Sequence, residues 1–567
     1  MRSYYLHAAQ INRLSELIVH RVTECDKPRF GASYVFGRTL REGIRLSQGH
    51  LTVTKPEVLE TSPDNLIRVF DDAQKYNCQL THETREMLRQ NLHLIDDDFR
   101  RSAEANATFF SVLKWKESVY ETLLEMHRAG VLGAFIPEFG RLLCMVMHDA
   151  YHIYTVDQHS LRLIKEIERL KAGDYAESAP LLTQLAREAE EIELLYLGLM
   201  FHDIGKGFGG GHSEIGAHMV RTIARRMRLN ADAGALVEFL VRHHLLMTHT
   251  AFRRDLEDEK TIFDFAKVMG SVDNLKMLYL LTFADVKAVG PEVWNPWKAS
   301  LLGELYVKAL HLLEEAEKGE FHREDVRAAL RRVQTRVRRQ LLKDFKLMDR
   351  FRGTRAELSV EHFPERDCTA VVICCQDRPG LFASITGVFS ALNFDILNAR
   401  IFTATDGRIL DVFRISHRGR AEVVTAEQKW FKFRAVLDGV LDGKIDIAHL
   451  VESFKPSLLF QKRAPKVPTA INIDNDASDD FTIVEVFTED RIGVLFTITY
   501  SLHRLGLSIH VAKISTNVDQ AADVFYVTDE AGGKITDPEQ VSTVRKFLQQ
   551  NLAPQNETSE RLVEPLH

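Results

Sequence analysis

"LMFHDIGKGFGGGHS" spans residues 199–213 and decides how this chain is interpreted. An apolar run ends in His202 and Asp203, Lys206 follows, and a glycine-rich loop leads to His212. An imidazole supplies a nitrogen ligand to a cation, and a carboxylate can bridge two ions. The stretch therefore predicts metal ligands at the end of a buried helix, beside a positively charged loop.

One His-Asp pair is weak evidence, because the chain carries a second pair at His148 and Asp149, with His152 four residues on. The first pair stands out because further possible ligands end or interrupt apolar helical stretches nearby: His159, His243, His244 and Asp285. A buried charge or imidazole is costly unless it is paired or ligated. Taken singly, each residue fits a hydrogen-bonded core position better. Taken together, they predict a metal site.

Helical periodicity dominates residues 1 to about 360. The apolar spacing predicts one helix over residues 110–130 that ends at Gly130, and others over residues 159–173 and 302–319. A further helix over residues 324–345 has a basic face that could bind an anion. We interpret that face as solvent-exposed surface with partners one helical turn away.

The tail of the chain contains a repeat. From about residue 366 the hydrophobic period changes to two. "DRPGLFASI" from Asp377 and "DRIGVLFTI" from Asp490 align 113 positions apart, and after a single-residue slip "DVF" at 411–413 meets "DVF" at 523–525. Residues 460–480 predict a linker or an exposed hairpin between the copies. We expect two copies of one small α/β module.

The bulk composition limits the class of protein. A chain of 567 residues exceeds one hydrophobic core, and 45% hydrophobic with 27% charged residues is typical of a globular protein. A net charge of -7 and a pI of about 6.4 indicate neither a nucleic acid nor a membrane as partner. We find no signal peptide and no apolar run that would span a membrane. Six scattered cysteines without a CxxC pair predict reduced thiols and a cytoplasmic protein.

The order H…HD…H…H…D resembles the HD phosphohydrolase superfamily. Longer stretches are similar to the family of bifunctional PII uridylyltransferase/uridylyl-removing enzymes: "LIDDDFRRS" (94–102), "RAGVLGAFIPEFGRLLCMVMHDAYHIYTVDQHSLR" (128–162), "FHDIGKGFGGGHSEIGA" (201–217), "VRHHLLMTHTAFRRDL" (241–256) and "VWNPWKASLL" (293–302). The similarity covers nearly the whole chain, and the two tail repeats look like ACT domains.

The resemblance implies two metal positions. It assigns one divalent ion to four side chains: His159, His202, Asp203 and Asp285. A second ion, bridged by Asp203, would be held by His212 and His244, with His243 the less certain member of its pair. Lys206 would face the substrate phosphate. The family implies Mg²⁺ or Mn²⁺, while a histidine-rich set on general grounds also suits Mn, Fe or Zn.

The implied reaction is hydrolysis of uridylyl-tyrosine on the small signalling protein PII, which yields UMP and free tyrosine. Water activated by the cations would attack phosphorus while Lys206 neutralises the phosphate oxygens. The leaving phenolate, with a pKa of about 10, needs little help from an acid. The glycines of the loop would let the backbone approach a nucleotide carried by a protein.

The ACT resemblance implies an amino-acid effector bound where modules pair, and in this family glutamine promotes uridylyl removal. Backbone N–H groups at a helix N-terminus would capture its carboxylate. The predicted contacts are Asp377, Arg378, Gly380, Asp490, Arg491 and Gly493. Pro379 becomes Ile492 in the second copy, so one module could be structural. The alternative is a purely dimer-forming role, with a homo-oligomer assembled through the ACT domains.

We therefore expect a multidomain protein in which an all-α region with an HD-type metal hydrolase domain precedes two α+β ferredoxin-like (βαββαβ) ACT domains. The predicted domains are a helical linker region at 1–145, the HD domain at 146–350, and ACT domains at 366–455 and 479–555. The family's Gly-Ser turn and D-x-D pair have no match, since residues 96–98 lack such a turn, so transferase activity is expected to be absent. The alternatives are a hydrolase of a small nucleotide, such as a guanosine polyphosphate, and a non-catalytic HD-ACT regulator.

Overall fold

The computed structural model describes residues 2–25, 38–146, 154–290, 293–317, 351, 355–404, 407–417, 423–453, 468–491, 493–517 and 520–553. The chain divides into two compact units by its internal contacts. The first unit comprises Met1–Met247 and Asp273–Val293, and the second comprises Thr248–Val272 and Trp294–His567. Among the described residues, no helix is both long and apolar enough to cross a bilayer.

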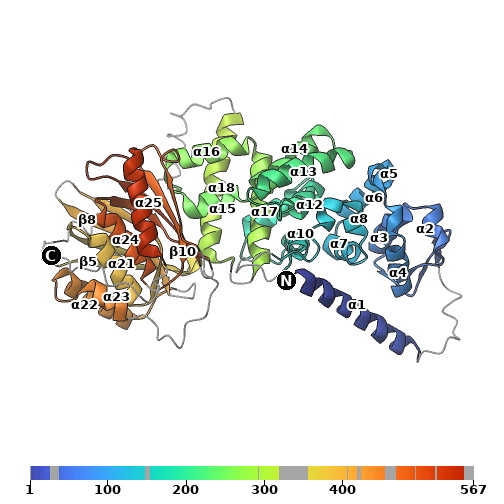
Figure 1. Ribbon diagram of the computed structural model, residues 1–567, viewed down its shortest axis with the longest axis horizontal. Coiled ribbons are helices and arrows are strands. Elements are labelled where there is room, and N and C mark those ends of the chain that lie inside the picture. The colour runs from blue at the N-terminus through green and yellow to red at the C-terminus, as the bar shows by residue number, and fades with distance from the viewer. Residues whose placement is uncertain are drawn as a thin grey trace. The chain divides into compact units, whose positions relative to one another are not determined.

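The first unit begins with the helix α1 (Arg2–Cys25) (Figure 1). On this helix Ile11, Leu14 and Ile18 form an exposed apolar stripe. A small sheet follows, made of β1 (Arg38–Arg41), β2 (Ile44–Ser47), β3 (His50–Val53) and β4 (Gln79–Leu80). Its first three strands pair antiparallel, and β4 joins β3 in parallel. Short helices complete this part: α2 (Glu57–Thr61), α3 (Asn65–Lys75), α4 (His82–Gln90), α5 (Asp97–Arg101), α6 (Ala103–Lys114), α7 (Val119–Arg128), α8 (Val131–Phe135) and α9 (Pro137–Gly140).

The prediction of a single helix over residues 110–130 is wrong, because the segment contains the end of α6 and all of α7. Ser118 adopts a φ of 63° between them, in the left-handed region that stops a helix. The first two amide groups of α7 donate to the Glu168 carboxylate at 2.7 and 3.3 Å. The apolar spacing continues across this break, so periodicity could not reveal it. Gly130, with a φ of 81°, follows the end of α7 as expected.

A helical bundle forms the rest of the first unit. Its members are α10 (Val156–Ala172), α11 (Pro180–Glu188), α12 (Ile192–Phe201), α13 (His212–Arg226), α14 (Ala231–His243) and α17 (Val272–Val289). Every residue of α12 except Glu193 is buried, because this helix is apolar on all sides. Helices α10 and α14 pack against it. The helix predicted over residues 159–173 lies within α10 and ends at Gly173, as expected.

The second unit combines α15 (Leu246–Arg253), α16 (Glu259–Met269) and α18 (Pro296–Glu317) with a large sheet. The helix predicted over residues 302–319 corresponds to α18, whereas the one over residues 324–345 lies outside the described residues. Within the part of the chain that the structure describes, the sheet has nine strands in the order β5-β6-β8-β7-β11-β13-β10-β9, with β12 paired to β13.

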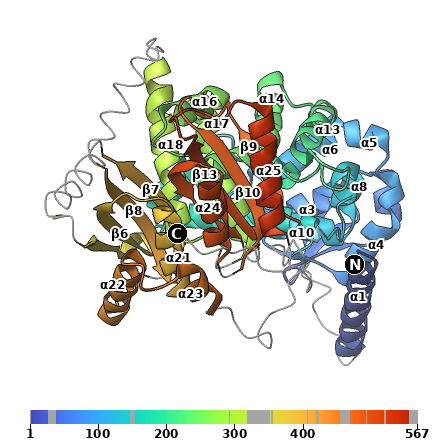
Figure 2. The ribbon, with the colours of Figure 1, turned by 60° about the vertical axis from the view of Figure 1, so that its left-hand side comes forward.

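The two tail repeats form two similar modules. The first contains β5 (Glu357–Phe363), β6 (Cys368–Gln376), α21 (Leu381–Ala391), β7 (Phe394–Thr403), β8 (Arg408–His417), α22 (Glu427–Leu441) and α23 (Ile447–Ser453). The second contains β9 (Ala470–Asp474), β10 (Thr482–Glu489), α24 (Val494–Arg504), β11 (Ser508–Lys513), β12 (Thr516–Asn517), β13 (Gln520–Thr528) and α25 (Pro538–Leu552). Helices α21, α24 and α25 lie on one face of the sheet (Figure 1 and Figure 2).

The ferredoxin-like fold class is confirmed, but the outer strand of each module comes first in the sequence. Strands β5 and β9 occupy the sheet edge that a final strand would fill, so the expected order βαββαβ is realised as ββαββα. The segment 460–480, predicted as a linker or an exposed hairpin, therefore supplies β9 to the sheet, while residues 460–467 lie outside the described part. Antiparallel pairing of β7 with β11 joins the two modules edge to edge.

The two faces of this sheet have different partners. Phe413 lies on the face covered by helices, within the main apolar core. Tyr526 points to the opposite face, where its hydroxyl oxygen accepts a hydrogen bond from the amide of Asp255 at 2.7 Å. The Asp255 carboxylate, from the turn between α15 and α16, lies 2.5 Å from Arg400 of β7 and 3.9 Å from Lys513 of β11. The α15–α16 turn is thus seated where the two modules meet.

Candidate metal centre

Asp203 is the centre of a cluster of buried polar side chains in the first unit. It follows α12, whose apolar sequence keeps the whole helix in the core. His202 and Asp203 come directly after this helix and are still buried, with exposed fractions of only 1% and 3%. Because a buried carboxylate is costly without partners, the groups around Asp203 determine what the cluster can do.

The two carboxylate oxygens of Asp203 face different partners. Oδ2 lies 3.1 Å from His202 Nε2 and 2.7 Å from Lys206 Nζ. Oδ1 lies 3.5 Å from His212 Nε2 and 3.9 Å from His244 Nε2. A carboxylate whose oxygens face two separate groups of donors is well placed to bridge two cations.

Asp285 of α17 completes the side of the cluster that contains His202. Its Oδ1 lies 2.9 Å from His159 Nε2 and 3.7 Å from His202 Nε2. Two triplets have ligand atoms within 4.8 Å of one another: His159, His202 and Asp203, and then Asp203, His212 and His244. The fold thus gathers all six side chains that the sequence suggested as metal ligands, from α10, α13, α17 and the residues that follow α12 and α14.

Two of the imidazoles are oriented by carbonyl groups of their own helices. His202 Nδ1 donates to the Leu199 oxygen and His244 Nδ1 donates to the Val241 oxygen, each at 2.8 Å. A proton on Nδ1 leaves Nε2 with its lone pair directed into the cluster. Backbone contacts of this kind are typical of histidines that bind metals.

The electrostatics of the cluster favour a cation. Burial lowers the pKa of His202, but Asp203 and then Asp285 outweigh it and raise that pKa to about 9. Burial raises the pKa of Asp203, yet His202 and Lys206 hold it well below its usual value. His244 behaves differently, since burial lowers its pKa to about 4 and keeps the ring neutral. Asp203 therefore stays ionised. The proton that His202 holds marks a position where positive charge, such as that of a metal ion, is favoured.

The approach of α13 to Asp203 depends on Gly205. A Cβ at this position would lie 2.0 Å from the carbonyl oxygen of His212 and 2.7 Å from the amide nitrogen of Gly216. No side chain fits in that space, so the loop after α12 and the first turn of α13 meet backbone to backbone. This contact brings the His212 ring next to Asp203.

Sequence reasoning missed Arg141, which follows α9. Its guanidinium donates to the carbonyl oxygens of Ile204 at 2.6 Å and Lys206 at 3.0 Å, and its central carbon lies 3.9 Å from the centroid of the Phe208 ring. Arg141 therefore holds the glycine-rich loop that carries Lys206. The residue lies within a stretch similar to the family, but neither its spacing nor its charge distinguishes it from other surface arginines.

His243 lies outside the cluster, although it is next to His244. Its ring packs against Phe239, with 4.9 Å between the centroids. Successive residues of a helix point about 100° apart, so only one of the two histidines can face the metal donors. The second His-Asp pair, with His148, Asp149 and His152, lies outside the described residues.

The arginines of the repeated turns are used within their own modules. Arg378 donates to the carbonyl oxygens of Leu441 at 2.6 Å and Val440 at 3.3 Å, at the end of α22. Arg491 donates to the Leu552 oxygen at 3.4 Å, at the end of α25. Both arginines satisfy carbonyl groups that a helix C-terminus leaves without partners. This geometry gives them a structural role, and their contact with an effector stays a prediction.

The glycines and aspartates of the same turns lie between a strand and the helix that follows it, β6 and α21 in the first module and β10 and α24 in the second. Gly380 and Gly493 precede α21 and α24 with φ values of 71° and 82°, which favour glycine. Asp377 is exposed, and Asp490 is half-buried. A Cβ on Gly380 would lie 3.2 Å from Cδ2 of His503 in the other module. The first turn is therefore close to the junction of the two modules.

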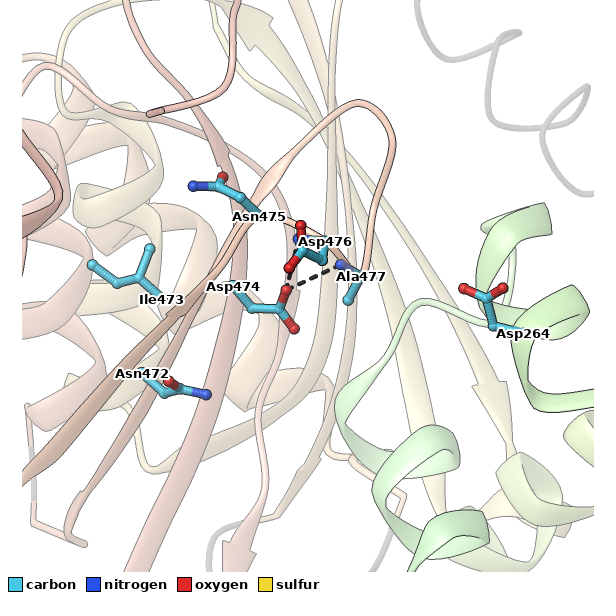
Figure 3. Close-up of a pocket in the computed structure, with 7 residues that line it drawn as sticks. All are labelled: Asp264, Asn472, Ile473, Asp474, Asn475, Asp476 and Ala477. Atoms are coloured by element: carbon cyan, nitrogen blue, oxygen red, sulfur yellow. Dashed lines mark hydrogen bonds between the residues drawn. The ribbon is translucent and has the colours of Figure 1, made fainter. Parts of the chain in front are cut away.

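A second acidic group lies at the loop after β9, where Asp264 and residues 472–477 line a hollow (Figure 3). Asp474 accepts hydrogen bonds from the amides two and three residues later, at 2.8 and 3.0 Å. Lys534 donates to two carbonyl oxygens of this loop and its continuation, each at 2.7 Å. Since these groups satisfy one another, we assign no ligand to the hollow.

Comparison with protein families agrees with this architecture. Residues 45–135 match the model of the uridylyltransferase GlnD third domain, and residues 156–278 match the HD domain. Residues 369–429 match the ACT domain, and residues 477–558 match the ACR family N-terminal ACT domain. The chain is thus an HD-domain protein with a GlnD third domain and two ACT domains.

Individual relatives extend this similarity over nearly the whole chain. Bifunctional uridylyltransferase/uridylyl-removing enzymes are 32% identical in Azospirillum brasilense, 31% in Rhodospirillum rubrum and 32% in Ectopseudomonas mendocina. The alignments cover 97–98% of this chain but 62–66% of those relatives. A solved tRNA-processing enzyme (apo form 2) matches 50% of this chain and 64% of its own at 13% identity, with a TM-score of 0.31, which carries no argument.

The chain is similar over nearly its whole length to bifunctional uridylyltransferase/uridylyl-removing enzymes. It spans somewhat less than two thirds of the length of these relatives.

Proposed function

We propose that this chain hydrolyses the phosphodiester that joins UMP to a tyrosine of the PII signalling protein. The observation that carries the proposal is the convergence of five further metal donors and Lys206 around the buried Asp203 carboxylate, in a chain similar over nearly its whole length to uridylyl-removing enzymes. The names of the relatives state the reaction, and the donor cluster provides a place for it.

The donors fit a pair of divalent cations. His159, His202, Asp203 and Asp285 would hold the first ion, and Asp203, His212 and His244 would hold the second. Imidazole and carboxylate ligands in this proportion suit Mn²⁺, Fe or Zn²⁺ as well as Mg²⁺, and the family favours Mg²⁺ or Mn²⁺. The neutral His244 ring and the ionised Asp203 are already in the protonation states that ligation requires.

Bound cations would supply charge neutralisation at the phosphate and a water of lowered pKa. The side chains do the remaining work. Asp203 fixes the distance between the two ligand sets, since one oxygen faces each of them. Lys206, whose Nζ lies 2.7 Å from Asp203, is close enough to neutralise a phosphate oxygen at the same place. The tyrosine leaving group, with a pKa of about 10, departs without a strong general acid.

Glutamine would regulate this reaction through the ACT modules. The support is the pair of modules joined through β7 and β11, with helix N-termini at both repeated turns. Such termini offer backbone N–H groups to a carboxylate. We expect uridylyl removal to respond to glutamine, the reaction to occur in the cytoplasm, and transferase activity to be absent from these residues.

Adjacent histidines give a matched test. His244→Ala removes a proposed ligand, whereas His243→Ala removes a ring that packs against Phe239 outside the cluster. With uridylylated PII and Mn²⁺, we expect UMP release to fall by at least about a hundredfold in His244→Ala and to stay near the parent value in His243→Ala. Equal activity in the two variants would refute the metal site. Release of product from a guanosine polyphosphate, but not from uridylylated PII, would favour the small-nucleotide alternative.

A further inference from the structure

The glycine-rich loop between Lys206 and His212 borders the open side of the metal centre. Both ends of the loop contact the same carboxylate, since Lys206 Nζ and His212 Nε2 lie 2.7 and 3.5 Å from the two oxygens of Asp203. His212 is also the most exposed of the six donors, with 26% of its side chain exposed. All five residues between the two ends are exposed. A substrate that reaches the donors from this side therefore lies beside the loop.

Phe208 is the one side chain that the loop presents there. The five residues between Lys206 and His212 are Gly-Phe-Gly-Gly-Gly. Phe208 is 52% exposed, although burial of an aromatic ring is strongly favourable. A Cβ at any of the glycines 209–211 would meet nothing within 4 Å, so the space around this part of the loop is open. The loop thus offers an aromatic ring to whatever occupies that space.

Arg141 supports one face of this ring. The central carbon of its guanidinium lies 3.9 Å from the centroid of the Phe208 ring, a distance at which a cation and a π face attract each other. The same guanidinium is fixed by its hydrogen bonds to the carbonyl oxygens of Ile204 and Lys206. Because Arg141 covers one face, the exposed part of the ring includes the opposite face, which is left for a ligand.

The position of the ring suits a group that is separated from the phosphate by a spacer. Lys206 extends its side chain inward to Asp203, whereas Phe208, two residues later, is exposed. The Cα atoms of these two residues are no more than about 7 Å apart. A tyrosine ring bonded to the phosphate through one oxygen would lie against the donors themselves. A nucleobase is one ribose further away, and bases commonly stack on aromatic side chains.

We propose that Phe208 stacks on the uracil base of the uridylyl group, with Arg141 supporting the other face of the phenyl ring. This inference rests on the proposed removal of UMP and adds to it the residue that holds the base. Phe208 is then a substrate-binding residue, and the metal donors and Lys206 bind the phosphate.

Isothermal titration of the full chain in Mn²⁺ tests this assignment with two ligands. UMP carries the base, and ribose 5-phosphate has the same phosphate and a ribose but no base. The parent should bind UMP at least about fivefold more tightly than ribose 5-phosphate. Phe208→Ala should weaken UMP binding at least about fivefold and change the affinity for ribose 5-phosphate by less than about twofold, because only the stack is lost. In the assay with uridylylated PII, kcat/KM for UMP release should fall by a factor similar to that for UMP binding.

Three further variants separate stacking from other roles of the side chain. Phe208→Leu keeps an apolar side chain without a π face and should weaken UMP binding, whereas Phe208→Trp keeps an aromatic ring and should bind UMP at least as tightly as the parent. Phe431→Ala is the matched control, because Phe431 of α22 is an 81% exposed phenylalanine in the second unit. It should bind UMP as the parent does.

The possible results distinguish this inference from the proposed function. Equal affinity of the parent and Phe208→Ala for UMP overturns the inference, and UMP release by the parent would still support the function. An equal loss for UMP and ribose 5-phosphate means that the ring only shapes the loop, which also overturns the inference. The same holds if UMP binding is unchanged while release from uridylylated PII falls, because the ring then contacts the protein substrate. If UMP binding depends on Phe208 but the parent releases no UMP from uridylylated PII, the proposed function fails and the base-stacking role stands.

Discussion

Replacement of Gly205 by alanine is the sharpest test of how the metal donors are assembled. The new Cβ would lie 2.0 Å from the His212 carbonyl oxygen, about 1.4 Å inside the 3.4 Å at which ordinary contact begins. The obstacle is backbone, so the first turn of α13 must withdraw. His212 Nε2 is now 3.5 Å from Asp203 Oδ1, and metal–ligand bonds tolerate little displacement. We expect the free energy of unfolding to fall by about 1–3 kcal/mol and the affinity for Mn²⁺ to fall at least about tenfold.

Gly234→Ala provides the control for this prediction. Gly234 lies inside α14, and a Cβ there would meet only the Ala224 Cβ at 3.5 Å, an ordinary contact. Alanine at that position should stabilise the helix by about 0.5–1 kcal/mol. Calorimetric titration with Mn²⁺ and unfolding in urea would be compared for both variants. If Gly205→Ala bound Mn²⁺ and unfolded like Gly234→Ala, α13 would not meet the loop at that glycine, and the reasoning would be refuted.

Other predictions concern the electrostatics of both units. With a chelator present to remove metal ions, His244 should destabilise the folded chain as the pH falls from about 6.5 to 4, because the unfolded state takes up the proton first. His202 should destabilise it as the pH rises from about 6.5 to 9, because the folded state holds its proton longer. Each effect should reach up to about 3 kcal/mol in urea unfolding, and a free energy of unfolding that does not change with pH would contradict the assigned pKa values. Asp255→Ala leaves the buried Lys513 and the partly buried Arg400 without this carboxylate and should cost about 3–5 kcal/mol in the same assay. Asp442→Ala, at an exposed ion pair, should cost nothing measurable. Arg378→Ala should lower the free energy of unfolding by about 1–3 kcal/mol through the end of α22, and an unchanged value would remove its role there.

Much of the metal cluster could be predicted because each donor interrupts an apolar stretch. A polar group at such a position needs a partner, and imidazole with carboxylate restricts what that partner is. The choice between His243 and His244 could not be made in the same way. Both end the same helix, and only the packing of the His243 ring on Phe239 separates them. Arg141 was missed for a related reason, since its acceptors are carbonyl oxygens, which every residue has.

Strand order was beyond local reasoning. A period of two identifies β6, β8, β10 and β13, but it does not say which neighbour each edge strand selects. In each module the edge strand, β5 or β9, therefore precedes the repeated segment in the sequence. Both predicted ACT boundaries, at 366 and 479, lie after this first strand. The break at Ser118 is similar, because a carboxylate distant in sequence, that of Glu168, stabilises a start of α7 that the apolar pattern conceals.

The position of Asp255 between Arg400 and Lys513 affects how the two copies of the module can diverge. Arg400 and Lys513 occupy matching positions in the two copies, yet both face the single carboxylate of Asp255. Their distances to it differ, because Arg400 lies 2.5 Å away and Lys513 lies 3.9 Å away. A single acidic side chain on the axis of an internal duplication therefore breaks its symmetry. Once the environments differ, substitutions in one copy are no longer equivalent to those in the other. Division of labour between a sensor and a support becomes the expected fate of such a pair.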